Sequence, residues 1–145
     1  MSPAGSIRDD SDAGSQSSQI VSTTYRALAR GDDEIFLENL ADMVEWIIPG
    51  PPDHPATGMH IGKEMLLSAF ARFSEVAELQ EMTIERVIGD GEIAVVLGRE
   101  RWRVRASGRF FDTIWANAVT VEDGKITRVV VYADTSNESA AYAGR

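Results

Sequence analysis

Residues 92–134, EIAVVLGRERWRVRASGRFFDTIWANAVTVEDGKITRVVVYAD, decide the fold. β-Branched and aromatic residues dominate three runs of this stretch and predict three long strands. The runs are residues 92–105, 109–121 and 125–134. Ser107-Gly108 and Asp123-Gly124 separate them, and Asp-Gly between such runs is a strong hairpin signal. The stretch therefore predicts an antiparallel meander with two tight turns.

Two-residue turns would fix the pairing of these strands. They place Glu100 opposite Trp115, Gly98 opposite Asn117, and Trp115 opposite Tyr132. Because side chains alternate between the faces of a strand, one face should gather aromatic and polar side chains. These are Glu100, Trp102, Trp115, Asn117, Tyr132 and Asp134. The other face should carry a row of arginines, Arg99, Arg101, Arg103 and Arg105.

Composition restricts the class of protein. The chain has 145 residues and a net charge of −9, which fits one domain and disfavours binding to nucleic acid. It has no cysteine, which excludes disulfide and thiolate chemistry. No apolar run approaches the roughly 20 residues of a membrane helix, and the N-terminus lacks the apolar core of a secretion signal. We therefore expect a cytoplasmic protein with no membrane partner.

The rest of the chain predicts helices followed by strands. Residues 1–17 are rich in Ser, Gly and Asp and should form a disordered tail, and residues 18–145 should form the domain. Helical spacing predicts helices at 18–30, 33–40 and 61–77, strand patterns cover 42–48 and 79–88, and a short helix is possible at 135–142. The order favours an α+β fold, in which a curved antiparallel sheet closes against the helices as a cone with an internal pocket.

Six short segments follow one another in a distinctive order. They are YRALARGD (25–32), LADMVEW (40–46), PG (49–50), TGMHIGKE (57–64), EDGKI (122–126) and YADT (132–135). In order and spacing they resemble the nuclear transport factor 2-like superfamily, and within it the SnoaL-like group of polyketide cyclases and ketosteroid isomerase relatives. The resemblance implies a cone pocket for an apolar ring-containing molecule, a homodimer, and acid–base chemistry that needs no cofactor.

The sequence departs from the best-understood relatives at their catalytic positions. The general base of ketosteroid isomerases would fall near Trp46 or Ile47, which take no proton, and their protonated aspartate would fall near Asn117. The Arg-x-Asp of limonene epoxide hydrolases would fall on residues 101–103, where the aspartate is missing. Polyketide cyclases use a late acidic residue, and Asp134 is the nearest candidate.

Four residues are candidates for catalysis. Asp134 is either an acid–base group or the cap of the following helix. Glu100 would have a raised pKa between two tryptophans, or would pair with an arginine outside if the register slips by one. Asn117 and Tyr132 could hold a carbonyl oxygen, and Asn117 could instead bond to neighbouring side chains.

Further residues are candidates for binding the substrate. They are Trp46, Trp102, Trp115, Phe70, His54 and His60. The aromatic rings suit either a pocket wall or a plain core, and the two histidines suit either a proton shuttle at the pocket mouth or a solvated loop. Their spacing is not that of a metal site. The function expected is cyclase- or isomerase-type chemistry on a ketone-bearing substrate. The alternatives are a non-catalytic ligand-binding or dimerisation module and an epoxide hydrolase-like enzyme.

Overall fold

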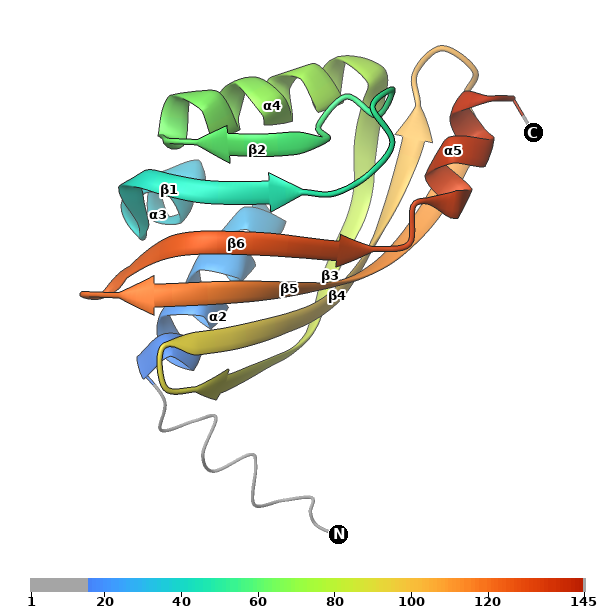
Figure 1. Ribbon diagram of the computed structural model, residues 1–145. Coiled ribbons are helices and arrows are strands. Elements are labelled where there is room, and N and C mark those ends of the chain that lie inside the picture. The colour runs from blue at the N-terminus through green and yellow to red at the C-terminus, as the bar shows by residue number, and fades with distance from the viewer. Residues whose placement is uncertain (1–15, 145) are drawn as a thin grey trace, which may run out of the picture.

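The computed structural model describes residues 16–144, which form an α+β cone (Figure 1). The elements are α2 (Gln16–Arg30), α3 (Asp33–Glu38), β1 (Leu40–Ile48), β2 (Gly58–Ile61), α4 (Lys63–Val76), β3 (Ala77–Asp90), β4 (Ile93–Val104), β5 (Phe110–Glu122), β6 (Lys125–Ala133) and α5 (Ser136–Tyr142). The predicted order is confirmed, with β2 added where a loop was expected. No helix within this part of the chain is long and apolar enough to cross a membrane.

One six-stranded sheet forms the wall of the cone. Its strand order is β2-β1-β6-β5-β4-β3, and only β1 and β6 run parallel to each other. Helix α2 packs against β3 and β4, and α4 packs against β1, β2 and β3, so the helices cover the concave side (Figure 1). The main core lies between them and includes Val21, Tyr25, Phe36, Leu40, Val44, Leu66, Val96 and Val119. The sheet therefore curls around its helices, as the sequence predicted.

The first helices begin and end where local chemistry dictates. Helix α2 ends before Gly31, whose φ of +80° favours glycine, and the Asp32 side chain then accepts a hydrogen bond from the Ile35 amide at 3.3 Å to cap α3. Helix α2 begins two residues before the predicted boundary, and Ser17 is already buried. The rest of the expected tail, residues 1–15, lies outside the described residues.

The predicted register between β4 and β5 is wrong by two residues. Gly98 pairs with Trp115, and Glu100 pairs with Thr113. The connection spans residues 105–109 rather than two residues, and the Val104 amide donates to the Arg109 carbonyl across it at 2.7 Å. A shift of two leaves every side chain on its predicted face.

A bulge changes the pairing of β5 and β6. Near the turn Val121 pairs with Ile126, as predicted, but the register then shifts so that Asn117 pairs with Val131. One extra residue in β6 exchanges the faces of everything beyond it. Tyr132 therefore lies on the outer face, 60% exposed, and Asp134 follows the strand on the exterior. The expectation that these two side chains face the pocket is wrong.

The outer face carries part of the predicted arginine row. Arg99 forms an ion pair with Glu85 at 3.5 Å, and Arg101 pairs with Asp112 at 3.0 Å. Arg105 does not belong to this row, because β4 ends at Val104 and the Arg105 side chain turns back to donate to the Ser74 carbonyl at 2.7 Å.

Candidate functional site

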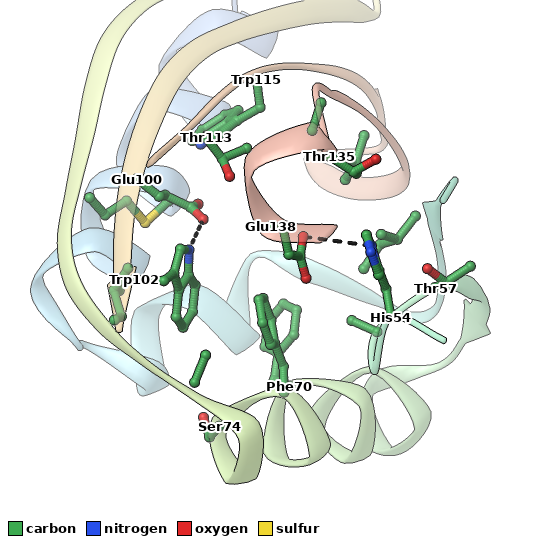
Figure 2. A pocket seen from close by; sticks show the side chains of 18 of the residues that line it. His54, Thr57, Phe70, Ser74, Glu100, Trp102, Thr113, Trp115, Thr135 and Glu138 are labelled. Carbon is green, nitrogen blue, oxygen red and sulfur yellow. Dashed lines mark hydrogen bonds and ion pairs between the residues drawn. The ribbon is translucent and has the colours of Figure 1, made fainter. Parts of the chain in front are cut away.

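A cavity of about 350 Å³ opens inside the cone. This volume is in the range of about 300–1,000 Å³ that is usual for small-molecule sites. Most of its lining is apolar and includes Tyr25, Trp46, Phe70, Phe73, Trp102, Phe111 and Trp115. Its polar lining includes His54, Thr57, Glu100, Thr113 and Glu138, which Figure 2 labels, and also Asn117. The cavity thus suits an apolar molecule that carries a few polar atoms.

Ring contacts hold the aromatic wall in place. Phe73 stacks on Trp102 with ring centroids 4.4 Å apart, and Phe70 meets Trp46 edge-on at 5.8 Å. Tyr25 stacks on Trp46 from α2 at 6.3 Å. The sequence placed Trp46, Phe70 and Trp102 at a pocket, and all three side chains line the cavity.

Glu100 projects from β4 into this aromatic surrounding. Its carboxylate accepts a hydrogen bond from the Trp102 indole at 2.8 Å (Figure 2). Burial raises the pKa of the Glu100 carboxyl, and the charge of Glu138 adds to the rise. The Trp102 hydrogen bond counters the rise, and the nearby Trp115 indole N–H does so more weakly, because it does not reach hydrogen-bond geometry with any described group. The carboxyl is therefore shifted toward its neutral form. Because the Glu100 side chain lines the cavity, the alternative in which it pairs with an arginine on the outer face is wrong.

Three polar atoms on the inner face of β5 have no hydrogen-bond partner. They are Thr113 Oγ1, Trp115 Nε1 and Asn117 Oδ1. The Asn117 amide nitrogen does donate to the Tyr25 hydroxyl at 2.8 Å. Buried polar atoms normally find partners, so these three are free to bind polar atoms of a ligand. Sequence reasoning missed Thr113, although strand alternation puts it on the same face as Trp115.

The C-terminal helix contributes a second polar group. Glu138 Oε1 lies 3.7 Å from His54 Nδ1 (Figure 2). The Tyr142 hydroxyl donates a hydrogen bond to Glu138 Oε2 at 2.7 Å. The other ring nitrogen of His54 lies 2.9 Å from Ser139 Oγ. Burial and the contacts with Glu138 raise the pKa of the Tyr142 phenol. Glu138 and Tyr142 are four residues apart, a spacing at which helical side chains meet, but nothing in the sequence placed that pair at the cavity.

The two histidines have different surroundings. His54 lines the cavity, whereas His60 lies on β2 with Nε2 2.8 Å from the Ala56 carbonyl oxygen and does not line it. Both side chains are buried, so the interpretation of solvated loop histidines is wrong. Nowhere in residues 16–144 do three His, Asp or Glu side chains gather in a way that could hold a metal ion.

Asp134 lies outside the cavity at the start of α5. Its carboxylate accepts hydrogen bonds from the Ser136 amide at 2.9 Å and from the Ser136 hydroxyl at 2.6 Å. These bonds lower the pKa of Asp134. Asp134 is nevertheless not the cap residue of α5: that position is Thr135, which makes no side-chain capping hydrogen bond, and Asp134 binds the first residue of the helix from one position earlier.

Comparisons with known proteins give the family. A model of the SnoaL-like domain matches residues 21–129. An uncharacterised protein of Mycobacterium tuberculosis is 30% identical over 143 residues, which cover 94% of this chain and 100% of that protein. The crystal structure of a nuclear transport factor 2-like (NTF2-like) protein from Burkholderia xenovorans is 32% identical, with a TM-score of 0.75 over 87% of this chain and 95% of that one.

A second NTF2-like crystal structure, from Burkholderia thailandensis, is 23% identical and covers 86% of this chain and 95% of that one. Its TM-score of 0.78 supports the fold alone at that identity. Solved structures described as SnoaL-like and ketosteroid isomerase-like are also among the matches. The protein therefore belongs to the SnoaL-like family and has the NTF2-like fold.

Proposed function

We propose that the protein binds a small, largely apolar, ketone-bearing molecule in its cavity and catalyses a proton transfer on it, with Glu100 as the acid–base group. The position of the Glu100 carboxyl carries this proposal. It lies in an aromatic cavity, and its one hydrogen-bond donor is the Trp102 indole. Desolvation raises its pKa, and a carboxyl kept neutral can donate a proton to a carbonyl oxygen.

The unpartnered atoms of β5 support the same chemistry. The Trp115 indole N–H and the Thr113 hydroxyl can both donate hydrogen bonds, and Figure 2 shows both side chains beside Glu100. Donors fixed in a water-poor site stabilise the charge that develops on a carbonyl oxygen. A ketone oxygen held by these groups would become more basic as a neighbouring carbon loses its proton, which is the first step of isomerase- or cyclase-type reactions.

A non-catalytic ligand-binding module is the second candidate. The side chains that β1 contributes to the cavity favour this candidate. They are Trp46 and Ile48, and neither can take up or release a proton. An epoxide hydrolase-like reaction has less support, because Arg101 lies on the outer face and pairs with Asp112. The two leading candidates differ in whether a bound ketone exchanges protons.

Hydrogen exchange tests the proposal without knowledge of the natural substrate. The protein is incubated in D₂O with 2-tetralone, an apolar bicyclic ketone with acidic C–H bonds, and deuterium uptake is followed by NMR. We expect catalysed exchange, slowed about 10²–10⁴-fold by Glu100→Gln, which keeps an acceptor for Trp102. Glu85→Gln is the control, because it makes the same substitution on the outer face, away from the cavity. Binding of the ketone without exchange would instead establish the binding module.

A further inference from the structure

We propose that Glu138 is a second proton-transfer residue of the cavity. It removes a proton from a carbon atom of the ligand, while Glu100 donates a proton to the carbonyl oxygen. The inference rests on the proposed function and deepens it. It assigns a catalytic role to the C-terminal helix α5, which supplies no residue to the site predicted from the sequence.

Glu138 reaches the cavity from a different wall than Glu100. Glu138 projects from α5 and Glu100 from β4, and both side chains line the same space (Figure 2). The Glu138 side chain is 13% exposed, so it is largely shielded from solvent. A ligand in the cavity would thus lie within reach of two carboxyl groups.

The two carboxyl groups have different surroundings. Glu138 accepts a hydrogen bond from the Tyr142 hydroxyl at 2.7 Å and lies 3.7 Å from Nδ1 of His54, so two polar groups hold its carboxyl in place. Glu100 has one indole donor in an apolar site, and its pKa is raised. Two carboxyl groups held in different surroundings can divide the roles of acid and base in a proton-transfer site. Glu138 is accordingly the base and Glu100 the acid.

Independent evidence for a ligand between them comes from β5. Trp115 is 8% exposed and Asn117 is 5% exposed, yet Trp115 Nε1 and Asn117 Oδ1 have no partner and their side chains line the cavity. A bound molecule with an oxygen at the indole and a hydroxyl at the amide would satisfy both. The unpartnered atoms therefore point to a polar ligand held against β5, beside Glu100.

The proposed step is balanced in atoms and electrons. A C–H bond next to the carbonyl breaks, and its proton goes to the ionised carboxylate of Glu138. The electron pair of that bond forms a carbon–carbon double bond, and the carbonyl oxygen takes the proton of neutral Glu100. The product is the enol, and no oxidant or reductant is needed. Reversal in D₂O, after the carboxyl groups exchange with solvent, places deuterium on the carbon.

His54 acts as a positioning residue in this scheme. Its Nδ1 faces Glu138 and its Nε2 faces Ser139, so neither ring nitrogen is free to face a ligand. The groups that face Glu138 are His54 from the loop before β2, Tyr142 from its own helix and the carboxyl of Glu100 across the cavity. Asp53 acts on Tyr142 as a further negative charge.

The test compares Glu138→Gln with the parent protein and with Glu100→Gln. With 2-tetralone as the probe, Glu138→Gln should slow exchange about 10²–10⁴-fold and leave the dissociation constant unchanged. Infrared spectroscopy of the bound, ¹³C-labelled carbonyl supplies a second readout. Its stretching frequency should fall on binding, keep that fall in Glu138→Gln and lose part of it in Glu100→Gln. Glu85→Gln again serves as the control.

The possible outcomes separate the two proposals. Exchange at the parent rate in Glu138→Gln, with slow exchange in Glu100→Gln, would overturn the role of Glu138 and leave the proposed function standing. No exchange by the parent protein would overturn both. If Glu138→Gln unfolds, Tyr142→Phe tests the same point, because it removes the hydroxyl that positions Glu138 and keeps the carboxyl group itself. Slower exchange in Tyr142→Phe with unchanged binding supports the role, and an unchanged rate opposes it.

Discussion

Gly98 and Trp115 face each other across β4 and β5, and a Cβ atom at residue 98 would lie 2.3 Å from Cζ2 of the indole. Only a residue without a side chain lets the Trp115 ring lie flat across β4 at this point. The ring in turn lines the cavity beside Glu100. The glycine therefore shapes the site although it contributes no chemistry to it.

Gly98→Ala should displace the Trp115 ring and destabilise the fold. Overpacking of a well-packed interior typically costs about 1–3 kcal/mol. Chemical denaturation measures the loss, and tryptophan fluorescence reports the changed surroundings of the ring. Because the clash needs the indole, Trp115→Phe should reduce the cost of Gly98→Ala, and a double-mutant cycle would show this as coupling. Additive effects of the two substitutions would contradict the explanation.

The raised pKa of Glu100 links folding stability to pH. The folded protein holds this proton at pH values where the unfolded chain, near its ordinary value of 4.5, has released it. Its contribution to stability is therefore complete below about pH 4.5 and is lost as pH rises through the folded-state pKa. Glu100→Gln cannot ionise, so its stability relative to the parent should increase across this window and then level off.

Denaturation curves at several pH values check this linkage. Glu85→Gln is the matched control, because Glu85 pairs with Arg99 at the surface and has no comparable burial. A constant difference between Glu100→Gln and the parent from acid to neutral pH would show that Glu100 titrates alike in the folded and unfolded states. That result would contradict the raised pKa of Glu100 and the acid role that depends on it.

Local signals in the sequence predicted the fold and one half of the site. The Asp123-Gly124 turn has φ of 51° and 76° at its two residues, as a two-residue hairpin turn requires, and the pairing next to it is the predicted one. Strand alternation then placed Glu100 and Trp102 on the cavity side. These features depend on residues close together in the chain, where pattern and turn chemistry are informative.

Features that depend on distant packing could not be predicted. The bulge in β6 lies between the turn and Tyr132, and no glycine or proline marks it among residues 126–131. It alone moves Tyr132 and Asp134 out of the cavity. Glu138 reaches the site because α5 packs back against β5 and meets the loop of His54. His54 and its partner Ser139 are 85 residues apart in the sequence. A contact between segments so far apart produces no helical or strand periodicity in the sequence from which it could be predicted.

We predict a homodimer that forms through the outer face of the sheet. Ile114 on β5 is 68% exposed and Tyr132 on β6 is 60% exposed, on central strands that the helices leave uncovered. Arg99 pairs with Ile114 across β4 and β5, and its aliphatic stem can pack beside the apolar surface. A second copy of the chain would remove these side chains from water, and a stable interface needs about 800 Å² from each partner.

Light scattering tests this prediction directly. The parent protein should have the mass of a dimer at micromolar concentration, and Ile114→Asp should shift it toward the monomer, because the interface would lose apolar contact and have to bury a charged group. Met65→Asp is the control, since Met65 is 55% exposed but lies on α4, on the other side of the sheet. A monomer mass for the parent would exclude the dimer. A dimer that survives Ile114→Asp and dissociates with Met65→Asp would place the interface on the helical side.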